Sequence, residues 1–558
     1  MKTKYKILAI SLLLLLSISC SKSFLDTRID TNMTPEELET NRGTIWGFAR
    51  AFYTPITYGF DVLDNNLMAA ATDEAQQTAA SGGVYYFNTG TINADVNPLA
   101  YLYTNYYEGI RAANFFLDYA KNGEEIIARN RDTVRDAANY RRDLETLKWF
   151  RAEAQIAKAY YYTELLKMYG GIPIVDATVD KATDTKKIPR SSYDEVVQYV
   201  VNLIDNNFSD LQDDWKTEDG LANQAGRFDQ LTALAIKSRL LLYAASPLNN
   251  PDNNRVKWQA AAKAAQDLIE KKNYTLPQNR DYRLLFVGNN PVQSNETIYI
   301  VRRPDNNFME INNYPIATPG GRSGVTPSHN LVSAYEYIGP ADPSDPYINR
   351  DPRLQASIVV NGSRWNGREI NQAPGGSDDM NNSNTTKTGY YLKKFLTDEL
   401  NLVQGAATQH QWIVYRYTEI LLNYAEAMNE AYGPDAVPSG YTLSARDALR
   451  QVRKSASTNL PDVTASGKDQ FRTAVKHERR IELAFEDHRY WDLLRWKDAE
   501  TVLNQPISGV MVTKSGSEYQ YKVMNVGNRV FMNRNYRFPF TRSEIVNSAG
   551  TMTQNEGY

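Results

Sequence analysis

WFRAEAQIAKAYYYTELLKMY, residues 149–169, is the stretch that decides the fold class. Its apolar and aromatic side chains fall on two neighbouring faces of a helix: Phe150, Ala154, Ala157, Tyr161 and Leu165 on one, and Trp149, Ala152, Ile156 and Tyr160 on the other. A helix with two apolar faces packs between other helices, so the pattern predicts a helical array. Gly170-Gly171 and Pro173 predict where this helix ends.

Helical patterns surround this stretch. The chain from about residue 35 to 272 is predicted to be mainly helical, with further helices over 231–245 and 256–271. Ser192 followed by Glu195 resembles a capping box, in which both side chains satisfy free backbone N–H groups. We therefore expect a helix to begin directly after Ser192.

The middle of the chain has a different composition. Short strands are predicted over 296–301, 355–360 and 389–395. The segments between them are rich in Gly, Asn, Pro and Ser, and they cover 304–327, 339–352 and 361–388. Loops of this length inside a compact domain are usually functional or disordered, so these segments are candidates for function.

Helical order returns after residue 411. The apolar seam of a helix over 412–432 is formed by Ile413, Tyr417, Ile420, Tyr424, Ala427 and Ala431. Helices over 444–454 and 470–497 follow. The sequence has no strict repeat period, but paired helices with Tyr and Ala at their contacts are consistent with a loosely repeating array of helical hairpins.

The segment HERRIELAFEDHRYWDLLRW (477–496) is the most patterned part of the chain. Three pairs of opposite charge are each three residues apart and can meet on a helix surface: Arg479 and Glu482, Glu486 and Arg489, Asp492 and Arg495. A face this dense in ion pairs and aromatic rings is typical of a packed seam or a protein interface. It does not resemble a ligand site.

The N-terminus has the parts of an export signal. Three lysines among the first six residues precede an apolar run, 7–19, that is shorter than the roughly 20 residues of a spanning helix. Ser17-Ile18-Ser19-Cys20 then resembles the lipobox of bacterial lipoproteins, in which the cysteine is acylated and becomes the first residue of the mature protein. That motif usually has leucine where this chain has Ser17. An ordinary secretory signal that contains a cysteine is the alternative.

Composition excludes several classes of protein. Cys20 is the only cysteine among 558 residues, which excludes a disulfide framework, a thiol nucleophile and a thiolate metal site from the mature chain. The net charge of −3 gives no electrostatic case for nucleic acid. A chain of this length is expected to form two or more hydrophobic cores. Tyrosine is unusually frequent, with 37 residues against 18 Phe and 8 Trp. Tyrosine rings suit stacking on sugars or peptides as well as core packing.

Enzyme motifs mostly fail in this sequence. His477-Glu478 begins like a zinc-protease helix, but Ile481 stands where the second histidine ligand is needed. The sequence contains neither a Gly-rich phosphate-binding loop nor a complete nucleophile elbow. His488 is expected to be a packed, hydrogen-bonded residue. Asp73-Glu74 is the nearest local carboxylate pair, and a loop-fixing or helix-terminal role is favoured for it over glycoside hydrolysis.

Seven segments together resemble the RagB/SusD family of nutrient-uptake outer-membrane lipoproteins from Bacteroidetes. In the family's order they are SCSKSFLD (19–26), YEGIRAANFFL (107–117), RAEAQIAKAYYYTELLKMYGGIPIV (151–175), IPRSSYDEV (188–196), RYTEILLNYAEAMNEAYG (416–433), ERRIELAFEDHRYWDLLRW (478–496) and YRFPFTRSEIVNSAGTMTQNEGY (536–558). The resemblance implies a mainly α fold, with a tetratricopeptide-like helical-hairpin scaffold and a loop-rich part that carries short β-strands. It also implies a surface protein that is not an enzyme and that covers a SusC-like TonB-dependent transporter.

The resemblance and the predicted elements together give an organisation for the chain. A signal peptide is expected over 1–19 and a lipidated tether over 20–34, with palmitate-type acyl chains on Cys20. An N-terminal SusD-like helical region is expected over 35–275, and a C-terminal RagB/SusD region over 276–558. The latter is subdivided into loops and short strands (276–411), helices (412–500) and a C-terminal tail (501–558).

The resemblance also suggests where a ligand binds. The starch-binding member of the family has an arc of aromatic residues in loops, and the corresponding loop here is 81–97. The predicted ligand-binding residues are Tyr85, Tyr86, Asn88, Asn307, Tyr314, Arg364 and Trp365. Aromatic rings stack on sugar rings, and side-chain amides form hydrogen bonds with the sugar hydroxyls. The polar and glycine neighbours of Trp365 favour exposure, with packing at a hairpin tip as the alternative. Alternation around Tyr86 and Phe87 predicts that one face of that loop is buried.

The expected function is capture of an oligosaccharide or polysaccharide at the cell outer membrane, followed by delivery to a SusC-like transporter. Tyrosines stand where the starch binder has tryptophans, so starch itself is not implied. No cofactor and no nucleic acid partner are expected, and the sequence leaves open whether calcium fixes a loop. Capture of peptides is the main alternative; a surface glycosidase and a structural protein without ligand are the others.

Overall fold

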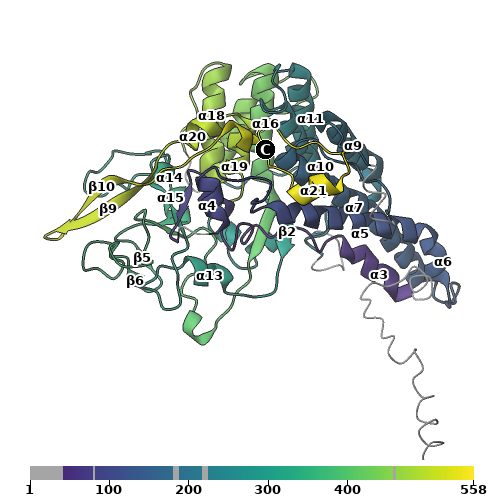
Figure 1. Cartoon of the computed structure of the whole chain (residues 1–558), viewed down its shortest axis with the longest axis horizontal. Coiled ribbons are helices and arrows are strands. Elements are labelled where there is room, and N and C mark those ends of the chain that lie inside the picture. The colour runs from purple at the N-terminus through teal and green to yellow at the C-terminus, as the bar shows by residue number, and fades with distance from the viewer. Residues whose placement is uncertain (1–41, 80–81, 180–187, 217–223, 279, 456–459) are drawn as a thin grey trace, which may run out of the picture.

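The structure is a computed structural model that describes residues 42–79, 82–179, 188–216, 224–278, 280–455 and 460–558 (Figure 1). The predicted signal peptide 1–19, the predicted lipidation site Cys20 and the predicted tether 20–34 lie outside these residues. Within the described part of the chain, no helix combines the length and the apolar character that crossing a membrane requires.

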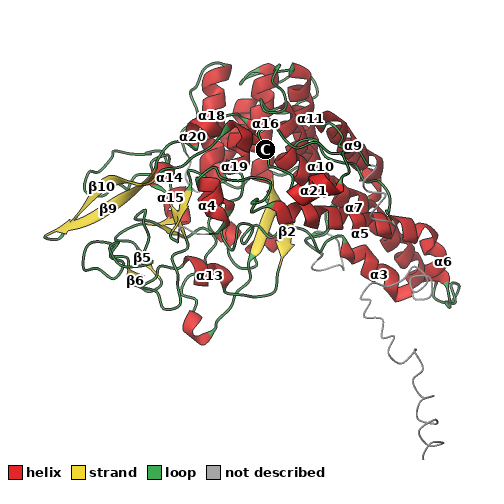
Figure 2. Cartoon of the chain, viewed as in Figure 1, coloured by secondary structure: helices red, strands yellow, loops and turns green. Residues whose placement is uncertain are grey.

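Helices packed side by side form one half of the molecule, on the right of Figure 2. They are α3 (Arg42–Ala51), α5 (Ala100–Tyr119), α6 (Gly123–Ala128), α7 (Ala137–Tyr169), α9 (Tyr193–Asn207), α10 (Gln230–Ala245) and α11 (Arg255–Lys272). Helix α5 packs on α7, α7 on α9, α9 on α10 and α10 on α11. This succession confirms the predicted helical array.

Local sequence signals set the ends of these helices. Helix α7 contains the stretch 149–169 and ends at Gly170, whose φ of +76° lies in the left-handed region that glycine tolerates. Ser192 caps α9 with both bonds of the predicted capping box: its hydroxyl accepts from the Glu195 N–H, and the Glu195 carboxylate accepts from the Ser192 N–H. Both predictions are therefore confirmed.

A second group of helices packs against the first. It comprises α16 (Tyr417–Tyr432), α17 (Ala445–Ser455), α18 (Lys468–Glu482), α19 (Arg489–Arg495) and α20 (Ala499–Val502). The prediction that helix begins at 412 is wrong, because β8 (Gln411–Arg416) is a strand that pairs antiparallel with β2 (Thr297–Arg302). All six residues of β8 are buried, so its apolar run is that of a strand covered on both faces.

The predicted helix over 470–497 is interrupted. Helix α18 ends at Glu482, and α19 begins at Arg489. Between them, Phe485 and Asp487 adopt left-handed backbone conformations with φ of +68° and +61°. This conformation is uncommon for residues other than glycine, and periodicity alone does not reveal it.

Tertiary partners, rather than neighbours on one helix, hold most charges of the segment 477–496. Asp492 and Arg495 form the predicted ion pair at 2.8 Å. Arg479 instead pairs with Asp492 at 3.1 Å, and Arg489 pairs with Asp73 at 2.8 Å. Arg479, Asp492 and Arg495 are buried and Arg489 is half-buried, so the segment is a packed seam and not an exposed interface.

The predicted strands of the middle region are present in shortened form. Besides β2, β4 (Ile358–Val359) pairs with β7 (Tyr391–Leu392), while residues 355–357 belong to α15 (Arg353–Ser357). The predicted loop segments contain small elements: α13 (Phe308–Asn313), β3 (Val325–Pro327), which pairs with β1 (Ala75–Gln77), and the hairpin of β5 (Arg364–Trp365) with β6 (Arg368–Glu369).

The region predicted as a C-terminal tail contains a long β-hairpin. Strands β9 (Ile507–Ser515) and β10 (Glu518–Gly527) pair antiparallel and project at the left of Figure 1. The short helix α21 (Arg542–Asn547) follows. The other short helices are η2 (Met68–Ala71), α4 (Gly83–Asn88), η3 (Ala120–Asn122), η4 (Phe208–Asp210), η5 (Leu284–Phe286), α12 (Asn290–Gln293), α14 (His329–Val332), η6 (Leu402–Gln404) and η7 (Asn533–Tyr536).

Nearly all buried apolar side chains of the described residues form one cluster, so the expectation of two or more cores is wrong. The cluster extends from Ile45 in α3 to Met552 near the C-terminus. Helix α16 and strand β8 explain this continuity, because both are buried along almost their whole length between the helical array and the loop-rich half. The two halves therefore share one interior.

Candidate ligand-binding surface

Helix α4 carries three of the predicted ligand-binding residues. The sequence predicts a loop over 81–97, but residues 83–88 form a short helix. At its start, the Gly83 N–H donates to the Asp64 carboxylate. At its end, Gly90 has φ of +66°, and a Cβ there would lie 2.8 Å from the Val530 carbonyl oxygen. Both ends of α4 are thus fixed by segments from elsewhere in the chain.

The two faces of α4 differ in burial. Val84 and Phe87 are buried, and the Phe87 ring lies 5.3 Å from that of Tyr490 and 5.8 Å from that of Phe538. Tyr85 is 49% exposed, and its ring meets that of Tyr86 edge-to-face at 5.6 Å. The prediction that one face of this segment is buried is confirmed. The opposite face presents an aromatic ring to solvent.

Carboxylates and a third tyrosine lie beside α4. Asp61 and Asp64 are exposed in the preceding segment. Tyr101, at the start of α5, donates its hydroxyl to the Val62 carbonyl at 2.8 Å. Burial raises the pKa of this hydroxyl, and the nearby Asp61 and Asp64 carboxylates raise it further. Rings and hydrogen-bond acceptors are therefore close together on this surface, as recognition of a hydroxyl-rich ligand requires.

Asn88 belongs to the framework of this surface. Its side-chain N–H donates to the Ala70 carbonyl at 3.4 Å, and its side-chain oxygen accepts from the Arg529 guanidinium. Both ends of the amide are therefore engaged within the protein. Asn88 connects α4 to η2 and to the segment after β10.

The expectation that Trp365 is exposed is wrong. Its side chain is 3% exposed, and its ring meets that of Tyr314 edge-to-face at 6.2 Å. The cations of Arg283 and Lys393 lie 5.3 and 5.5 Å from the ring centre. The polar loop sequence around Trp365 contains no sign of these partners, because they come from distant parts of the chain.

The other predicted residues are spread over separate elements. Tyr314 is fully buried, donates its hydroxyl to the Thr397 carbonyl and accepts from the Leu400 N–H at 3.3 Å. Asn307 donates to the Ala406 carbonyl at 3.0 Å, and Arg364 is exposed on β5. In Figure 1, β5 lies at the lower left and α4 near the centre. The structure thus groups Tyr85, Tyr86 and Asn88, and separately Tyr314 and Trp365.

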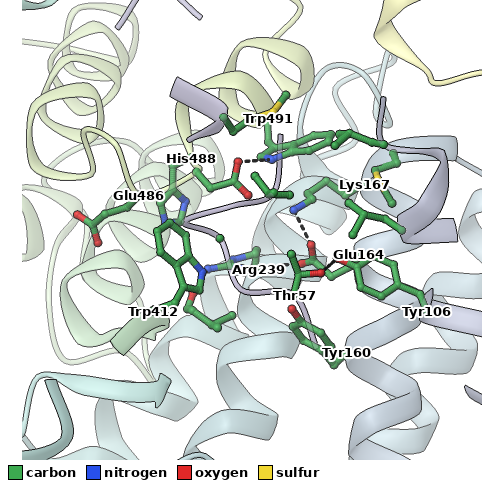
Figure 3. Close-up of a pocket in the computed structure, with 18 of the residues that line it drawn as sticks. Thr57, Tyr106, Tyr160, Glu164, Lys167, Arg239, Trp412, Glu486, His488 and Trp491 are labelled. Atoms are coloured by element: carbon green, nitrogen blue, oxygen red, sulfur yellow. Dashed lines mark hydrogen bonds and ion pairs between the residues drawn. The ribbon is translucent and has the colours of Figure 1, made fainter. Parts of the chain in front are cut away.

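A polar cavity lies beneath the segment 57–68 (Figure 3), and no local pattern in the sequence predicts it. Its volume is about 50 Å³, room for one or two water molecules and too small for a sugar ring. Glu164 pairs with Lys167 at 2.5 Å, and Trp491 donates to Asp487 at 3.1 Å. Burial and the nearby Arg239 lower the pKa of His488, so this histidine is neutral.

Asp73 and Glu74 fix a loop. Asp73 accepts from Arg480 at 2.6 Å and from Arg489 at 2.8 Å, and Glu74 accepts from the Phe485 N–H at 3.2 Å. Both carboxylates are buried. The predicted loop-fixing role is confirmed, because these contacts join the segment before β1 to α18 and α19.

Comparisons with known proteins agree with this architecture. The family profile described as "SusD family" matches residues 293–558, and the profile described as "Starch-binding associating with outer membrane" matches residues 24–242. SusD-like protein P38 of Formosa agariphila is 26% identical over 380 residues, which are 65% of this chain and 69% of that protein. SusD-like protein P2 of the same organism is 24% identical over 447 residues, which are 78% of this chain and 79% of that protein.

Solved structures share the fold. A SusD-like protein from Bacteroides fragilis superposes with a TM-score of 0.75 at 23% identity, covering 93% of this chain and 98% of its own. A SusD-like carbohydrate binding protein from the same organism superposes with a TM-score of 0.73 at 24% identity, and the match covers 91% of this chain and 99% of that protein. A laminarin binding SusD-like protein superposes with a TM-score of 0.63 at 20% identity, and the match covers 93% of this chain and 100% of that protein. The mainly α fold predicted from the sequence is confirmed.

Proposed function

Since the chain belongs to the SusD family, we propose that it is a cell-surface lipoprotein that captures an oligosaccharide without cleaving it and passes it to a SusC-like TonB-dependent transporter. Relatives described as carbohydrate binding and laminarin binding have the same fold, which supports a saccharide as the ligand. One of the matching profiles is described as associating with the outer membrane, which supports that location.

The observation that carries this proposal is the exposed aromatic face of α4. Tyr85 is 49% exposed, although Gly83, Val84 and Phe87 of the same helix are buried and both ends of the helix are held by other segments. A rigidly held ring stacks on the apolar face of a sugar with little loss of conformational entropy. The exposed carboxylates of Asp64, which holds the start of α4, and Asp61, near Tyr101, are acceptors for sugar hydroxyls.

The state of the local carboxylate pair supports binding without cleavage. Asp73 and Glu74 are buried and engaged with Arg480, Arg489 and the Phe485 N–H, so they are not placed to act on a surface ligand. A delivery protein must also release its ligand. We therefore expect a dissociation constant in the micromolar to millimolar range.

Glycan-array binding of the chain from Ser21 to Tyr558, followed by calorimetry on each positive glycan, tests the proposal. Tyr85→Ala should weaken binding at least tenfold, because the stacking surface is lost. Tyr337→Ala is the matched control, since Tyr337 is 44% exposed on a different part of the molecule. An equal loss of glycan affinity in both variants would mean that the binding site is not at Tyr85. If the parent chain binds no glycan, the proposal that its ligand is a saccharide is wrong.

Peptide capture is tested in the same assay. Val530 and Met532 are 42% and 41% exposed in the segment that contacts α4, so the surface also offers apolar side chains to a peptide. A peptide digest that competes with the bound glycan, or binds when no glycan does, would favour this function. Lipid attachment is tested separately: labelling with an acyl-chain probe in cells should disappear in Cys20→Ala.

A further inference from the structure

The segment after β10 runs along the loop that carries the aromatic surface. The Val530 N–H donates to the Asn88 carbonyl at 2.9 Å, at the end of α4. Further along, the Arg542 N–H donates to the Ala94 carbonyl at 3.1 Å, and its side chain pairs with Asp95 at 2.7 Å. Residues more than 430 positions apart in sequence are therefore tied together at successive points. The start of this segment, Arg529, makes the most contacts.

The guanidinium of Arg529 lies between three elements of the surface. One terminal nitrogen donates to the Ala70 carbonyl at 3.0 Å, at the end of η2, and to the side-chain oxygen of Asn88 in α4. The other donates to the Ala75 carbonyl at 2.6 Å and to the Gln76 side-chain oxygen at 3.3 Å, both in β1. One side chain thereby fixes η2, β1 and α4 relative to one another.

Arg529 differs from the other buried arginines of the molecule in its partners. Arg353 and Arg416 are paired directly with buried carboxylates. The contacts of Arg529 are to carbonyl and amide oxygens, and its side chain is buried. A planar fork of donors can hold four acceptors from separate segments in a fixed geometry, which an ammonium group or an apolar side chain cannot reproduce.

We propose that Arg529 is the positioning residue of the ligand-binding surface: by bridging Ala70, Gln76 and Asn88 it sets the orientation of α4, and through α4 that of Tyr85. The inference rests on the proposed function, since it assigns Arg529 a role in ligand binding without contact with the ligand. Loss of the bridge leaves the half-buried Asn88 side-chain oxygen and the buried backbone oxygens without this donor, so α4 loosens before the rest of the fold.

The test compares Arg529→Met, Arg529→Lys and Arg534→Met. Arg534 lies in the same segment, and its one side-chain hydrogen bond within the described part of the chain is to the Gly90 carbonyl at 3.4 Å, so it controls for loss of an arginine there. Amide hydrogen exchange is measured over residues 83–89 and over α10, and glycan affinity is measured by calorimetry. Arg529→Lys keeps the charge and some donors, and it remains informative if Arg529→Met does not fold.

We expect exchange over residues 83–89 to rise at least tenfold in Arg529→Met and severalfold in Arg529→Lys, with α10 unchanged. Glycan affinity should fall in the same order, and Arg534→Met should match the parent. Equal acceleration in α10 would make Arg529 a general stability residue and overturn the proposal. Loosened α4 with unchanged affinity would also overturn it. If the parent binds no glycan, the proposed function fails, while hydrogen exchange still decides whether Arg529 holds α4.

Discussion

Two regions of this protein are rich in polar and aromatic residues, yet they are used in opposite ways. In the segment 478–495, most charged side chains are buried and paired, with Glu482 accepting from Arg280, Arg353 and Arg416. On α4, aromatic rings divide between core and solvent, with Phe87 packed inside and Tyr85 exposed. The first region holds the molecule together, and the second leaves a ring free for a ligand.

The difference shows that residue type does not separate a structural region from a binding region. Buried ions persist in proteins only where opposite charges and hydrogen bonds compensate the loss of water. Glu482 meets this condition: burial alone would raise its pKa, but the neighbouring Arg280, Arg416 and Arg353 hold the pKa well below its usual range. An exposed ring held by a rigid support has no such internal partner.

Glu482→Gln should produce the largest loss of stability. The change leaves three buried guanidinium groups, 2.8 to 2.9 Å from the present carboxylate, without their shared negative charge. Removal of one partner from such a network costs about 3–5 kcal/mol, which would be seen in urea unfolding or as failure to fold. Lys121→Ala is the control, because Lys121 is exposed and its pair with the half-buried Asp118 contributes less than about 1 kcal/mol. Similar small losses in both variants would mean that the network does not hold the core.

Trp365→Ala should come next, at about 3 kcal/mol or slightly more, as for other buried aromatic side chains. The ring fills space between Tyr314, Arg283 and Lys393, so its removal leaves a cavity. Arg364→Ala, at the adjacent exposed position of β5, should change the free energy of unfolding by no more than about 0.5 kcal/mol. If Trp365→Ala weakens glycan binding without loss of stability, Trp365 is a ligand-binding residue and not a core residue.

Glu74→Gln should stabilise the protein, but only at neutral to alkaline pH. Burial, reinforced by the adjacent Asp73, raises the pKa of Glu74 to about 8, against about 4.3 in an unfolded chain. A carboxyl with a raised pKa in the folded state contributes stability that is complete below pH ~4.3 and is lost as the pH rises toward 8. The neutral amide of glutamine does not ionise, so the variant lacks this loss of stability. Between pH 5 and pH 8.5, its free energy of unfolding relative to that of the parent should rise by on the order of 1–3 kcal/mol. Parallel pH profiles for the two proteins would show that Glu74 ionises normally.

The sequence predicted those parts of the fold whose cause is local. Periodicity identified α7, and the capping box at Ser192 identified the start of α9. The strand β8 was missed because its apolar run is decided by pairing with β2, more than a hundred residues earlier. The break at Phe485 was missed because partners in distant segments, and not helix propensity, fix the backbone there.

The binding surface was predictable to a similar extent. Alternation around residues 84–88 indicated one buried face, and Phe87 lies on it. The support from Asp64 and Arg529 has no local signal, because Arg529 follows Asn88 by 441 positions in the chain. The burial of Trp365 could not be foreseen for the same reason: the side chains that cover it come from outside its hairpin.

The smallest expected effect makes the sharpest test, because it compares neighbours on one helix. Phe87→Ala should cost about 3 kcal/mol, since the ring packs on Tyr490 and Phe538. Tyr85→Ala, two positions earlier, should change the free energy of unfolding by no more than about 0.5 kcal/mol, because its ring is half exposed and meets chiefly Tyr86. Urea unfolding measures both. If Tyr85→Ala costs as much as Phe87→Ala, Tyr85 serves the core, and any loss of glycan binding in that variant reflects a damaged α4 and not a missing contact.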